Sequence, residues 1–483
     1  EYFPQKRPMP ASVPLVNDLA ALDAAFARIR QASRADLAAP LAERRRRLDA
    51  LEALLRDNID ALCAAVSADF GHRSPHETRL LEIFPSIEGI RHTRRHLARW
   101  SKPQRRSVSL WFQPGRAEVR PQPLGCVGIV TPWNYPIYLA IGPLTAAFAA
   151  GNRALVKMSE FTPSTATVLA ELARRYFTAD ELAIVEGDMA VAEAFTRLPF
   201  DHLLFTGSTA VGRHVMRAAA DNLTPVTLEL GGKSPAIIAP DYPLEKAAAR
   251  ILTGKCLNAG QTCIAPDYVF VPAGKEEAFC EAARRIVAKS YPEIVRNSDY
   301  TSIVNERHYQ RLNGYLEDAK ARGATLVPLA EYPPDGANRR CLPPTLILGA
   351  NDDMQIMQDE IFGPLLPVFT YDRLDDALAF INRRDRPLAL YLFDNDRRRI
   401  RHVLDHTVAG GVTINDTILH IAQENLPFGG VGPSGMGHYH GHEGFLTFSK
   451  LKPVFYQSRI NGIGLFNPPY GKLFEHLLKV LLR

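Results

Sequence analysis

Three polar residues, far apart in the chain, lie where a side chain could take part in covalent chemistry. The first is Cys263, in the polar, glycine-containing turn 258–266 (NAGQTCIAP) just before a strand predicted over residues 267–272. A cysteine in a turn at the edge of a strand is placed for reaction. Most cysteines are buried structural thiols, however, and this residue alone leaves that alternative open.

Glu229 ends an apolar strand predicted over residues 226–228. Burial would raise the pKa of this carboxyl and suit it to act as a general base. An ion pair with Lys233 explains the residue equally well. Asn134 lies in the turn 131–136 (TPWNYP), where its amide could donate a hydrogen bond to a developing oxyanion. Taken alone, ordinary asparagine turn chemistry is the better explanation of Asn134.

Two further motifs are weaker signals. Residues 205–212 (FTGSTAVG) follow a predicted strand and open a helix, so their backbone amides could hold a phosphate. The turn is not a P-loop, because Arg213 and His214 stand where lysine and serine or threonine are required. Alternating histidines at 438, 440 and 442 could share one face of a strand and bind zinc. We reject a metal site because no second cluster of ligands accompanies them.

Composition narrows the class of protein. The 483 residues are 46% hydrophobic and 23% charged, which is typical of a soluble globular chain of two to four domains. A net charge of +5 gives little support for nucleic-acid binding. The arginine run 44–47 is flanked by Glu43 and Asp49, which favours a solvated helix face. Six cysteines without a framework spacing favour a reduced, cytoplasmic location.

Three segments bear on targeting and membranes. Residues 1–12 are polar and rich in proline, so we expect no secretory signal. Residues 121–152 carry no charge, but their prolines and glycines exclude a spanning helix and indicate a strand, a loop and a buried helix. Residues 471–483 form an amphipathic helix too short to span a bilayer. We expect this tail to pack against the protein, with peripheral membrane contact the less favoured alternative.

The hydrophobic pattern predicts two α/β domains in series. Helical periodicity covers residues 15–70, with one apolar stripe through residues 48, 51, 55, 59 and 62. From residue 126 short apolar runs alternate with helical segments, which is typical of parallel strands with covering helices. Strands are expected at 126–130, 154–156, 182–185, 203–205, 235–239, 268–271, 345–348, 388–393 and 412–415. Segments 107–122 and 444–456 fit neither layer and could form an arm that pairs with another subunit.

Seven short motifs, which follow one another along the chain in the family's order, resemble the aldehyde dehydrogenase superfamily over nearly the whole chain. They are PWNY (132–135), KMSE (157–160), FTGS (205–208), LELGGK (228–233), GQTC (260–263), EIFGP (360–364) and PFGG (427–430). Residues 263–268 and 437–441 look like the class 3 and coniferyl-aldehyde dehydrogenase branch. Met158 departs from the family's usual proline, at a loop expected near the cofactor ribose.

The resemblance implies a fold and its division. A Rossmann-like NAD-binding domain would comprise residues 1–106 and 127–232, and an α/β catalytic domain residues 233–430. A small β oligomerisation arm would be formed by residues 107–126 and 431–460. Residues 461–483 would follow as a C-terminal tail, and the arm favours a homodimer.

The resemblance also implies the chemistry of an NAD(P)-dependent aldehyde dehydrogenase. Cys263 would attack the aldehyde, and Asn134 with the Cys263 backbone N–H would hold the oxyanion of the thiohemiacetal. Hydride loss to the nicotinamide would leave a thioester, which water activated by Glu229 would hydrolyse to the acid. Because a glutamate at 160 would repel a 2′-phosphate, NAD is favoured, with NADP as the alternative.

Contacts are implied residue by residue. Lys157 and Glu160 would contact the adenosine ribose, and Glu360 the nicotinamide ribose. The other expected cofactor contacts are Thr131, Trp133, Gly207, Ser208, Gly212, Leu230 and Phe362. Candidates for the substrate tunnel are Tyr135, Ile264 and His420, although core packing explains each nearly as well. Their largely apolar surroundings favour an aromatic or a medium-to-long aliphatic aldehyde.

Two rival functions remain at this point. A cysteine hydrolase would use Cys263 without a nicotinamide and would need a histidine partner, yet no histidine occurs between His214 and His308. A non-catalytic protein on the same fold would be favoured by loss of Cys263, Glu229 or Asn134, and all three are present. The sequence does not specify the physiological aldehyde, the cofactor preference or the number of subunits.

Overall fold

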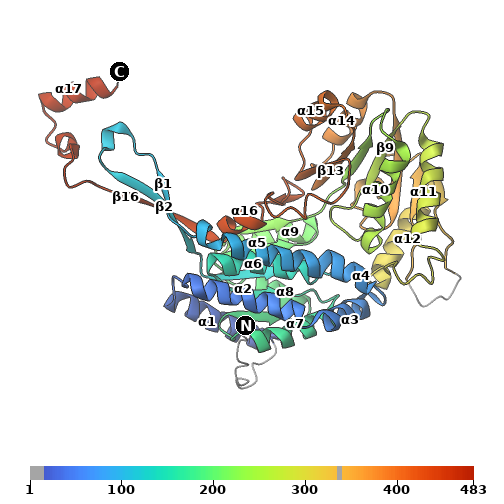
Figure 1. The fold of residues 1–483 in the computed structure, drawn as a ribbon, viewed down its shortest axis with the longest axis horizontal. Coiled ribbons are helices and arrows are strands. Elements are labelled where there is room, and N and C mark those ends of the chain that lie inside the picture. Colours follow the sequence, from blue (N-terminus) through green and yellow to red (C-terminus); the bar gives the residue numbers. More distant parts are fainter. Residues whose placement is uncertain (1–15, 334–339, 483) are drawn as a thin grey trace.

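The computed structural model describes residues 16–333 and 340–482. Two α/β bodies lie side by side, and a narrow arm projects from the first of them (Figure 1). The segment 1–12, read above for a secretory signal, lies outside the described residues. Because the two bodies are built on separate sheets, each is described by its sheet.

The first body is a Rossmann-like sheet of six strands in the order β15-β7-β6-β3-β4-β5. All its pairings are parallel except that of β15 with β7. Its strands are near-continuous apolar runs, as expected of strands covered on both faces. The strands are β3 (Cys126–Val130), β4 (Arg153–Lys157), β5 (Leu182–Val185), β6 (His202–Thr206), β7 (Val226–Glu229) and β15 (Gly435–Met436). The covering helices are α1 (Leu19–Ala35), α6 (Tyr138–Ala150), α7 (Pro163–Tyr176), α8 (Met189–Thr196) and α9 (Thr209–Ala220).

Further helices from the N-terminal part of the chain pack against this body. They are α2 (Leu41–Arg56), α3 (Ile59–Phe70), α4 (Pro75–Thr78), the π-helical turn η1 (Arg79–Ile83) and α5 (Phe84–Trp100). The predicted apolar stripe is buried at residues 48, 51, 55 and 62. The solvated face proposed for the arginine run is wrong for Arg44 and Arg47, which are buried. Arg44 donates to the Ala39 carbonyl, and Arg47 is paired with Glu181, so packed partners replace water around both charges.

The second body is a seven-stranded sheet in the order β10-β11-β12-β9-β8-β13-β14, parallel except for β10. Strands β10 and β12 were not predicted. The strands are β8 (Pro235–Ile238), β9 (Tyr268–Pro272), β10 (Thr325–Pro328), β11 (Thr345–Leu348), β12 (Leu365–Tyr371), β13 (Ala389–Phe393) and β14 (Gly411–Ile414). The helices are α10 (Leu244–Cys256), η3 (Leu257–Gly260), α11 (Glu276–Ser290), α12 (Glu306–Ala321), α13 (Gln355–Gln358), α14 (Leu374–Asn382) and α15 (Arg397–His406).

The arm is a three-stranded antiparallel sheet that stands away from both bodies (Figure 1). It comprises β1 (Gln104–Arg106), β2 (Arg116–Pro123) and β16 (Ser449–Tyr456), with the turn η2 (Leu110–Phe112) at its tip. Strand β16 lies at an edge of this sheet. The helix α16 (Gly441–Thr447) precedes it, so the first residues of the predicted segment 444–456 are helical. The domain boundaries drawn from the sequence stay a prediction.

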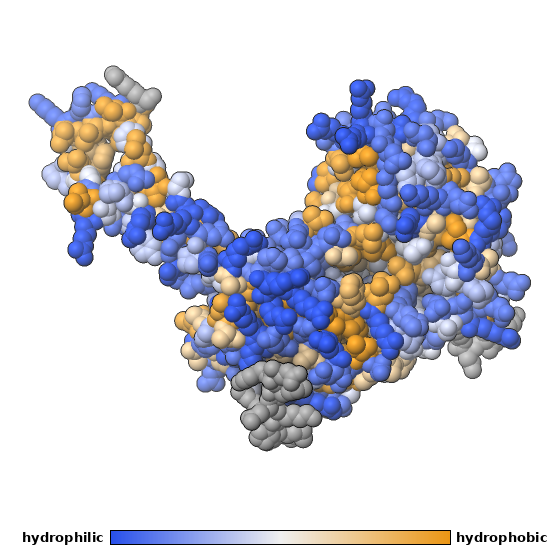
Figure 2. Space-filling view, in the orientation of Figure 1, coloured by the Kyte–Doolittle hydropathy of each residue, from blue (hydrophilic) through white to orange (hydrophobic). Residues whose placement is uncertain are grey.

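The tail after the arm contains η4 (Ile463–Phe466) and the predicted amphipathic helix α17 (Lys472–Leu481). Helix α17 has no buried residue and lies beyond the arm, not on the body of its own chain (Figure 1). Apolar side chains gather over this region in Figure 2, where Leu465, Tyr470 and Leu473 are exposed. Among the described residues, none of the helices combines the length and the apolar character that crossing a bilayer requires.

Candidate active site

Most of the predicted site residues lie at one edge of the six-stranded sheet, where parallel strands end. Strand β7 ends at Glu229, and the backbone N–H of Gly207, just after β6, donates to the Glu229 carbonyl at 3.0 Å. At the neighbouring strands, the N–H of Thr131 donates to the carbonyl of Lys157 at 2.9 Å. Ligands bind at the carboxyl ends of strands in open parallel sheets, so the sheet itself brings these residues together.

The Glu229 side chain is buried, and neither of its oxygens has a hydrogen-bond partner among the described residues. Burial raises the pKa of this carboxyl well above its ordinary value. The alternative of an ion pair with Lys233 is wrong. The Lys233 ammonium instead contacts a carboxylate oxygen of Asp267 at 2.5 Å and the Ile356 carbonyl at 2.7 Å. Both Glu229 oxygens are therefore available to accept or donate a proton.

Cys263 is the one partly exposed cysteine of the six, all of which lie in the described residues. Burial, followed by the carboxylates of Glu360 and Glu229, raises the pKa of its thiol. The backbone N–H groups of Cys263 and Ile264 oppose this shift by donating to the sulfur. The two carboxylates act on the thiol because they lie close to it, so the fold brings Cys263, Glu229 and Glu360 together. A purely structural thiol would not require this exposure or this surrounding charge.

The turn before Cys263 has an unusual backbone. Asn258, Ala259 and Gly260 have φ of +52°, +51° and +72°, in the left-handed region that residues with a Cβ rarely adopt. Side chains hold the turn in this shape. The Asn258 amide donates to the Gln261 carbonyl at 3.1 Å, and the Gln261 amide donates back to the Asn258 carbonyl at 3.0 Å. The position of Cys263 is thus set by a braced, strained turn.

Asn134 is fastened to the same turn. Its side-chain amide donates to the Gln261 carbonyl at 3.1 Å, and its own carbonyl accepts from the Asn258 amide at 3.0 Å. An asparagine amide carries two hydrogens, so one remains after the bond to Gln261. Asn134 therefore lies buried beside the Cys263 turn with a donor still to offer.

Glu360 faces the glycine pair that follows Glu229. Its carboxylate accepts from the Gly232 N–H, and a Cβ on Gly231 would collide with it. Burial, and after it the charge of Asp267, raises the pKa of Glu360 to about 8. One Glu360 oxygen has no partner among the described residues. A carboxylate with a spare acceptor suits the hydroxyls of a ribose.

The other predicted cofactor contacts surround this edge. Ser208 caps α9, whose exposed first turn offers backbone donors to a phosphate. Gly212, which lies in α9, packs against Leu230. Phe362 has φ of +48°, and its ring lies 5.3 Å from that of Trp133. The Lys157 ammonium donates to the carbonyls of Met158 and Gly187, which leaves one of its three hydrogens. Glu160 is exposed just beyond the end of β4. These donors and acceptors fit a nicotinamide dinucleotide.

The three proposed substrate residues are buried. The Tyr135 hydroxyl bonds that of Thr262 at 2.7 Å, so it borders the Cys263 turn. The Ile264 carbonyl accepts from the Tyr391 hydroxyl. His420 contacts the Thr413 hydroxyl at 2.9 Å, and burial lowers its pKa to about 4, which keeps the ring neutral.

Sequence reasoning missed a set of aromatic side chains near the thiol. Burial raises the pKa of Tyr138, Tyr391 and Tyr439, and the charge of Cys263 adds to the rise at each. Tyr439 belongs to the motif 437–441 that signalled the family branch, but nothing in the sequence marked the other two. These three buried tyrosines therefore lie close enough to Cys263 for charge on the sulfur to act on them.

The alternating histidines do not form a strand, because His440 has φ of +105° and precedes α16. Burial lowers the pKa of His440 to about 3. Within residues 16–333 and 340–482 no group of three metal-ligating side chains is found.

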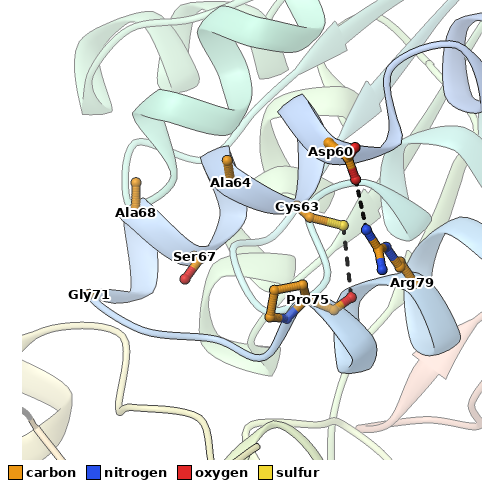
Figure 3. Close-up of a pocket in the computed structure, with 8 residues that line it drawn as sticks. All are labelled: Asp60, Cys63, Ala64, Ser67, Ala68, Gly71, Pro75 and Arg79. Carbon is orange, nitrogen blue, oxygen red and sulfur yellow. Dashed lines mark hydrogen bonds and ion pairs between the residues drawn. The ribbon is translucent and has the colours of Figure 1, made fainter. Parts of the chain in front are cut away.

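A surface pocket of about 500 Å³ lies elsewhere, between α3 and the α4 region (Figure 3). Cys63 faces it, but burial raises the pKa of this thiol, and Arg79 is paired with Asp60 at 2.7 Å. None of the predicted site residues lines this pocket. We assign it no role in catalysis.

Comparisons with known proteins find a matching family model, similar sequences and similar structures. A family model described as "Aldehyde dehydrogenase family" matches residues 4–454. A probable coniferyl aldehyde dehydrogenase of Pseudomonas aeruginosa is 55% identical over 457 residues, covering 95% of each chain. A solved substrate-bound state of Staphylococcus aureus AldH superposes with a TM-score of 0.90 at 36% identity, covering 96% of this chain and 99% of that one. An NAD⁺ complex of a Mycobacterium tuberculosis aldehyde dehydrogenase superposes at 0.82 with 29% identity, covering 92% and 91%.

The perturbed thiol predicts an unusual pH dependence of alkylation. Because thiolate is the reactive form, a raised pKa keeps the iodoacetamide rate constant of Cys263 rising above pH 9. An ordinary cysteine thiol levels off near its pKa of about 8.5. Glu229→Gln removes one neighbouring negative charge, so the rise shifts to lower pH. Peptide mass spectrometry from pH 6 to pH 10 measures the alkylation rate of the wild type and of Glu229→Gln, with the unfolded chain as control. A plateau below pH 8 would contradict this picture.

Proposed function

The chain belongs to the aldehyde dehydrogenase family, and from this premise we propose that it oxidises coniferyl aldehyde or a similar aromatic aldehyde to the carboxylic acid, with NAD as hydride acceptor. As a member, it is an NAD(P)-dependent aldehyde dehydrogenase. The resemblance to the coniferyl-aldehyde dehydrogenase branch is likewise confirmed. The observation that carries the mechanistic proposal is the partly exposed thiol acted on by Glu229 and Glu360, with the Asn134 amide on the adjoining turn.

The first step is attack of the Cys263 sulfur on the aldehyde carbon. The thiol proton moves to Glu229, directly or through water, so the pair exchanges one proton without gaining charge. Burial disfavours both anions and raises the pKa of both groups. A proton that passes between them leaves a single negative charge in the dry site.

Charge then develops on the former carbonyl oxygen. The spare hydrogen of the Asn134 amide and the Cys263 backbone N–H donate to this oxyanion in the thiohemiacetal. One such donor contributes about 2.7–4 kcal/mol to a transition state in a dry site. When bound, the nicotinamide would supply the acceptor for the hydride that leaves the carbon as the oxyanion collapses. Cys263 is then held as a thioester, oxidised by two electrons relative to the thiohemiacetal.

Hydrolysis regenerates the thiol. Glu229 first releases the thiol proton to solvent and then takes a proton from water, which adds to the thioester carbonyl, and the same two donors hold the second oxyanion. Collapse expels the Cys263 sulfur, which recovers its proton, and releases the acid. One carboxyl therefore serves both halves of the reaction, as its burial and lack of fixed partners allow.

The remaining residues would hold the cofactor. Glu360 would accept from the nicotinamide ribose, and the α9 N-terminus at Ser208 would take the pyrophosphate. Lys157 and Glu160 would bind the adenosine ribose. The exposed carboxylate of Glu160 repels a 2′-phosphate, which favours NAD over NADP.

An aromatic aldehyde is favoured by the buried tyrosines near the sulfur. Tyr138, Tyr391 and Tyr439 interact with Cys263, and Tyr135 borders its turn. Each ring contact is worth about 0.5–1.5 kcal/mol beyond apolar burial. The relatives named for coniferyl aldehyde support the same substrate class.

We further propose a homodimer formed through the arm, in a cytoplasmic protein. Strand β16 is an edge strand whose outer backbone groups can pair with another sheet. Leu451, Phe455 and Trp111 are exposed on the arm, and apolar side chains gathered on an exposed surface often mark an interface. The cysteine spacings, which lack a disulfide framework, favour the reducing compartment.

Replacement of the two central residues tests the chemistry. We expect Cys263→Ala to abolish NADH formation from any aldehyde. Glu229→Gln should lower kcat about 100- to 10,000-fold, the usual contribution of a general base. Glu52→Gln is the matched control, because Glu52 is also buried but is paired with Arg91 at 2.9 Å. Thioester or ester hydrolysis without NADH in the wild type would instead identify a cysteine hydrolase, and silence on every substrate a non-catalytic protein.

A panel of aldehydes tests the substrate class. We expect kcat/KM for coniferyl aldehyde to exceed that for straight-chain aldehydes of similar size about tenfold, because one favourable ring contact of about 1.4 kcal/mol gives that factor. NADH absorbance at saturating NAD gives the ratio. Equal or higher values for the straight-chain aldehydes would contradict the aromatic assignment while leaving the reaction class intact.

Charged residues introduced on the arm test the dimer. The pair Leu451→Glu and Phe455→Glu places two carboxylates on the proposed interface, so light scattering should show a monomer where the wild type is a dimer. Lys452→Glu, an exposed neighbour on the same strand, is the control for charge alone and should change the mass less. A monomeric wild type, or a dimer that survives both apolar replacements, would show that the arm is not the interface.

A further inference from the structure

Three charged side chains outside the proposed catalytic set are buried together behind the site. Arg73 and Glu82 are fully buried and Glu77 is 7% exposed. The Arg73 guanidinium donates to a Glu82 oxygen at 2.8 Å and lies 3.8 Å from a Glu77 oxygen. Burial raises the pKa of both carboxyls. A buried ionic cluster contributes little net stability, because desolvation offsets the attraction, so another role for it has to be considered.

Two members of the cluster hold the segment that carries Asn134. The same Arg73 nitrogen that donates to Glu82 also donates to the Asn134 carbonyl at 3.2 Å. The second Glu82 oxygen accepts the N–H groups of Ile137 and Tyr138 at 2.7 and 3.1 Å, at the start of α6. The guanidinium also lies 4.8 Å from the centre of the Tyr135 ring. Four successive contacts thus fasten residues 134–138 to Arg73 and Glu82.

The third member holds the turn that carries Cys263. One Glu77 oxygen accepts the Asn258 N–H at 2.6 Å, at the first of the left-handed residues. The other accepts the Thr301 hydroxyl at 2.5 Å. A left-handed asparagine persists only where its surroundings impose it, and Glu77 supplies part of that constraint.

The two segments also bond each other directly. The Asn134 carbonyl receives both the Arg73 guanidinium and the Asn258 amide, and the Tyr135 hydroxyl bonds that of Thr262. The buried cluster therefore reaches both sides of the gap across which Asn134 and Cys263 would hold the substrate oxygen.

We propose that Arg73, Glu77 and Glu82 are positioning residues that set the placement of the Asn134 donor relative to Cys263. The proposal rests on the oxyanion role given to Asn134 above. None of the three touches substrate or cofactor in this scheme, and each acts through the backbone it holds. Displacement of a catalytic group by about 1 Å can cost about 100-fold in rate, so loss of these contacts is expected to lower kcat/KM in a variant that still folds.

A double-mutant cycle on kcat/KM tests the link. We expect Arg73→Met to lower kcat/KM for the aldehyde about 10- to 100-fold in the wild-type background. In the Asn134→Ala background the same change should cost less than about threefold, because the donor that Arg73 positions is already gone. Equal losses in both backgrounds, or no loss in the wild type, would overturn the proposal. A partial recovery in Arg73→Lys, which keeps one donor of the fork, would support it further.

Arg47→Met is the matched control. Arg47 is equally buried, lies 3.3 Å from a Glu181 oxygen and donates to the Asn152 carbonyl at 3.1 Å, but it holds neither catalytic segment. It should lower thermal stability and leave kcat/KM within about twofold. A loss as large as that of Arg73→Met would show general destabilisation and overturn the proposal. If Arg73→Met does not fold, Glu82→Gln, which keeps the shape and the acceptor of the carboxyl, replaces it in the same cycle.

The cycle distinguishes failure of the proposed function from failure of the positioning role. If the oxyanion role of Asn134 is wrong, Asn134→Ala alone leaves kcat/KM unchanged. If only the positioning role is wrong, Asn134→Ala lowers kcat/KM strongly and the losses from Arg73→Met and Asn134→Ala are additive. The cofactor KM gives an independent readout, because a displaced Asn134 should leave KM for NAD unchanged while a disordered sheet edge would raise it.

Discussion

The site depends on the removal of water from a few ionisable groups where the six-stranded sheet meets the second body. Burial raises the pKa of Glu229, Glu360 and Cys263 together. In water a carboxylate is some four pKa units too weak to take a proton from a thiol. In the buried site the pKa of both groups is raised, and in the proposed mechanism the two groups share a single proton. The same dryness strengthens every hydrogen bond to an oxyanion.

Close packing of backbone against side chains excludes water from this region. Gly231 lies so close to the Glu360 carboxylate that any side chain there would displace it. Lys233, two residues on, contacts Asp267 and the carbonyl of Asp359, which draws the segment after Glu229 against the loop that carries Glu360. Gly231 and Lys233 of the motif 228–233 therefore bring Glu229 close to the segments that carry Glu360 and Asp267. These two residues act at the contact between the two bodies, not within either sheet.

The arm and the tail differ from the bodies in what they leave uncovered. Strand β16 pairs along its whole length with β2, yet its other edge is open. Helix α17 is strongly amphipathic and buries none of its residues. The largest hydrophobic core runs through both bodies, whereas the three strands of the arm and helix α17 contribute no residue to it. The proposed dimer would cover this part of the chain with a second copy.

Local pattern in the sequence determined the elements. Apolar runs placed β3, β5 and β11 at their observed bounds, because buried parallel strands are continuous apolar segments. The same pattern singled out Cys263, Glu229 and Asn134 as reactive types in turns and at strand ends, and the order of the motifs specified the family. It could not decide between Glu229 paired with Lys233 and Glu229 alone, because that depends on Asp267, which lies 34 positions after Lys233, just before β9. Nor did it mark Arg73, Glu77 and Glu82, or correct the solvated face assigned to Arg44 and Arg47. A charge is buried or solvated according to which distant backbone carbonyls and carboxylates the fold brings to it, and only the tertiary structure supplies those partners.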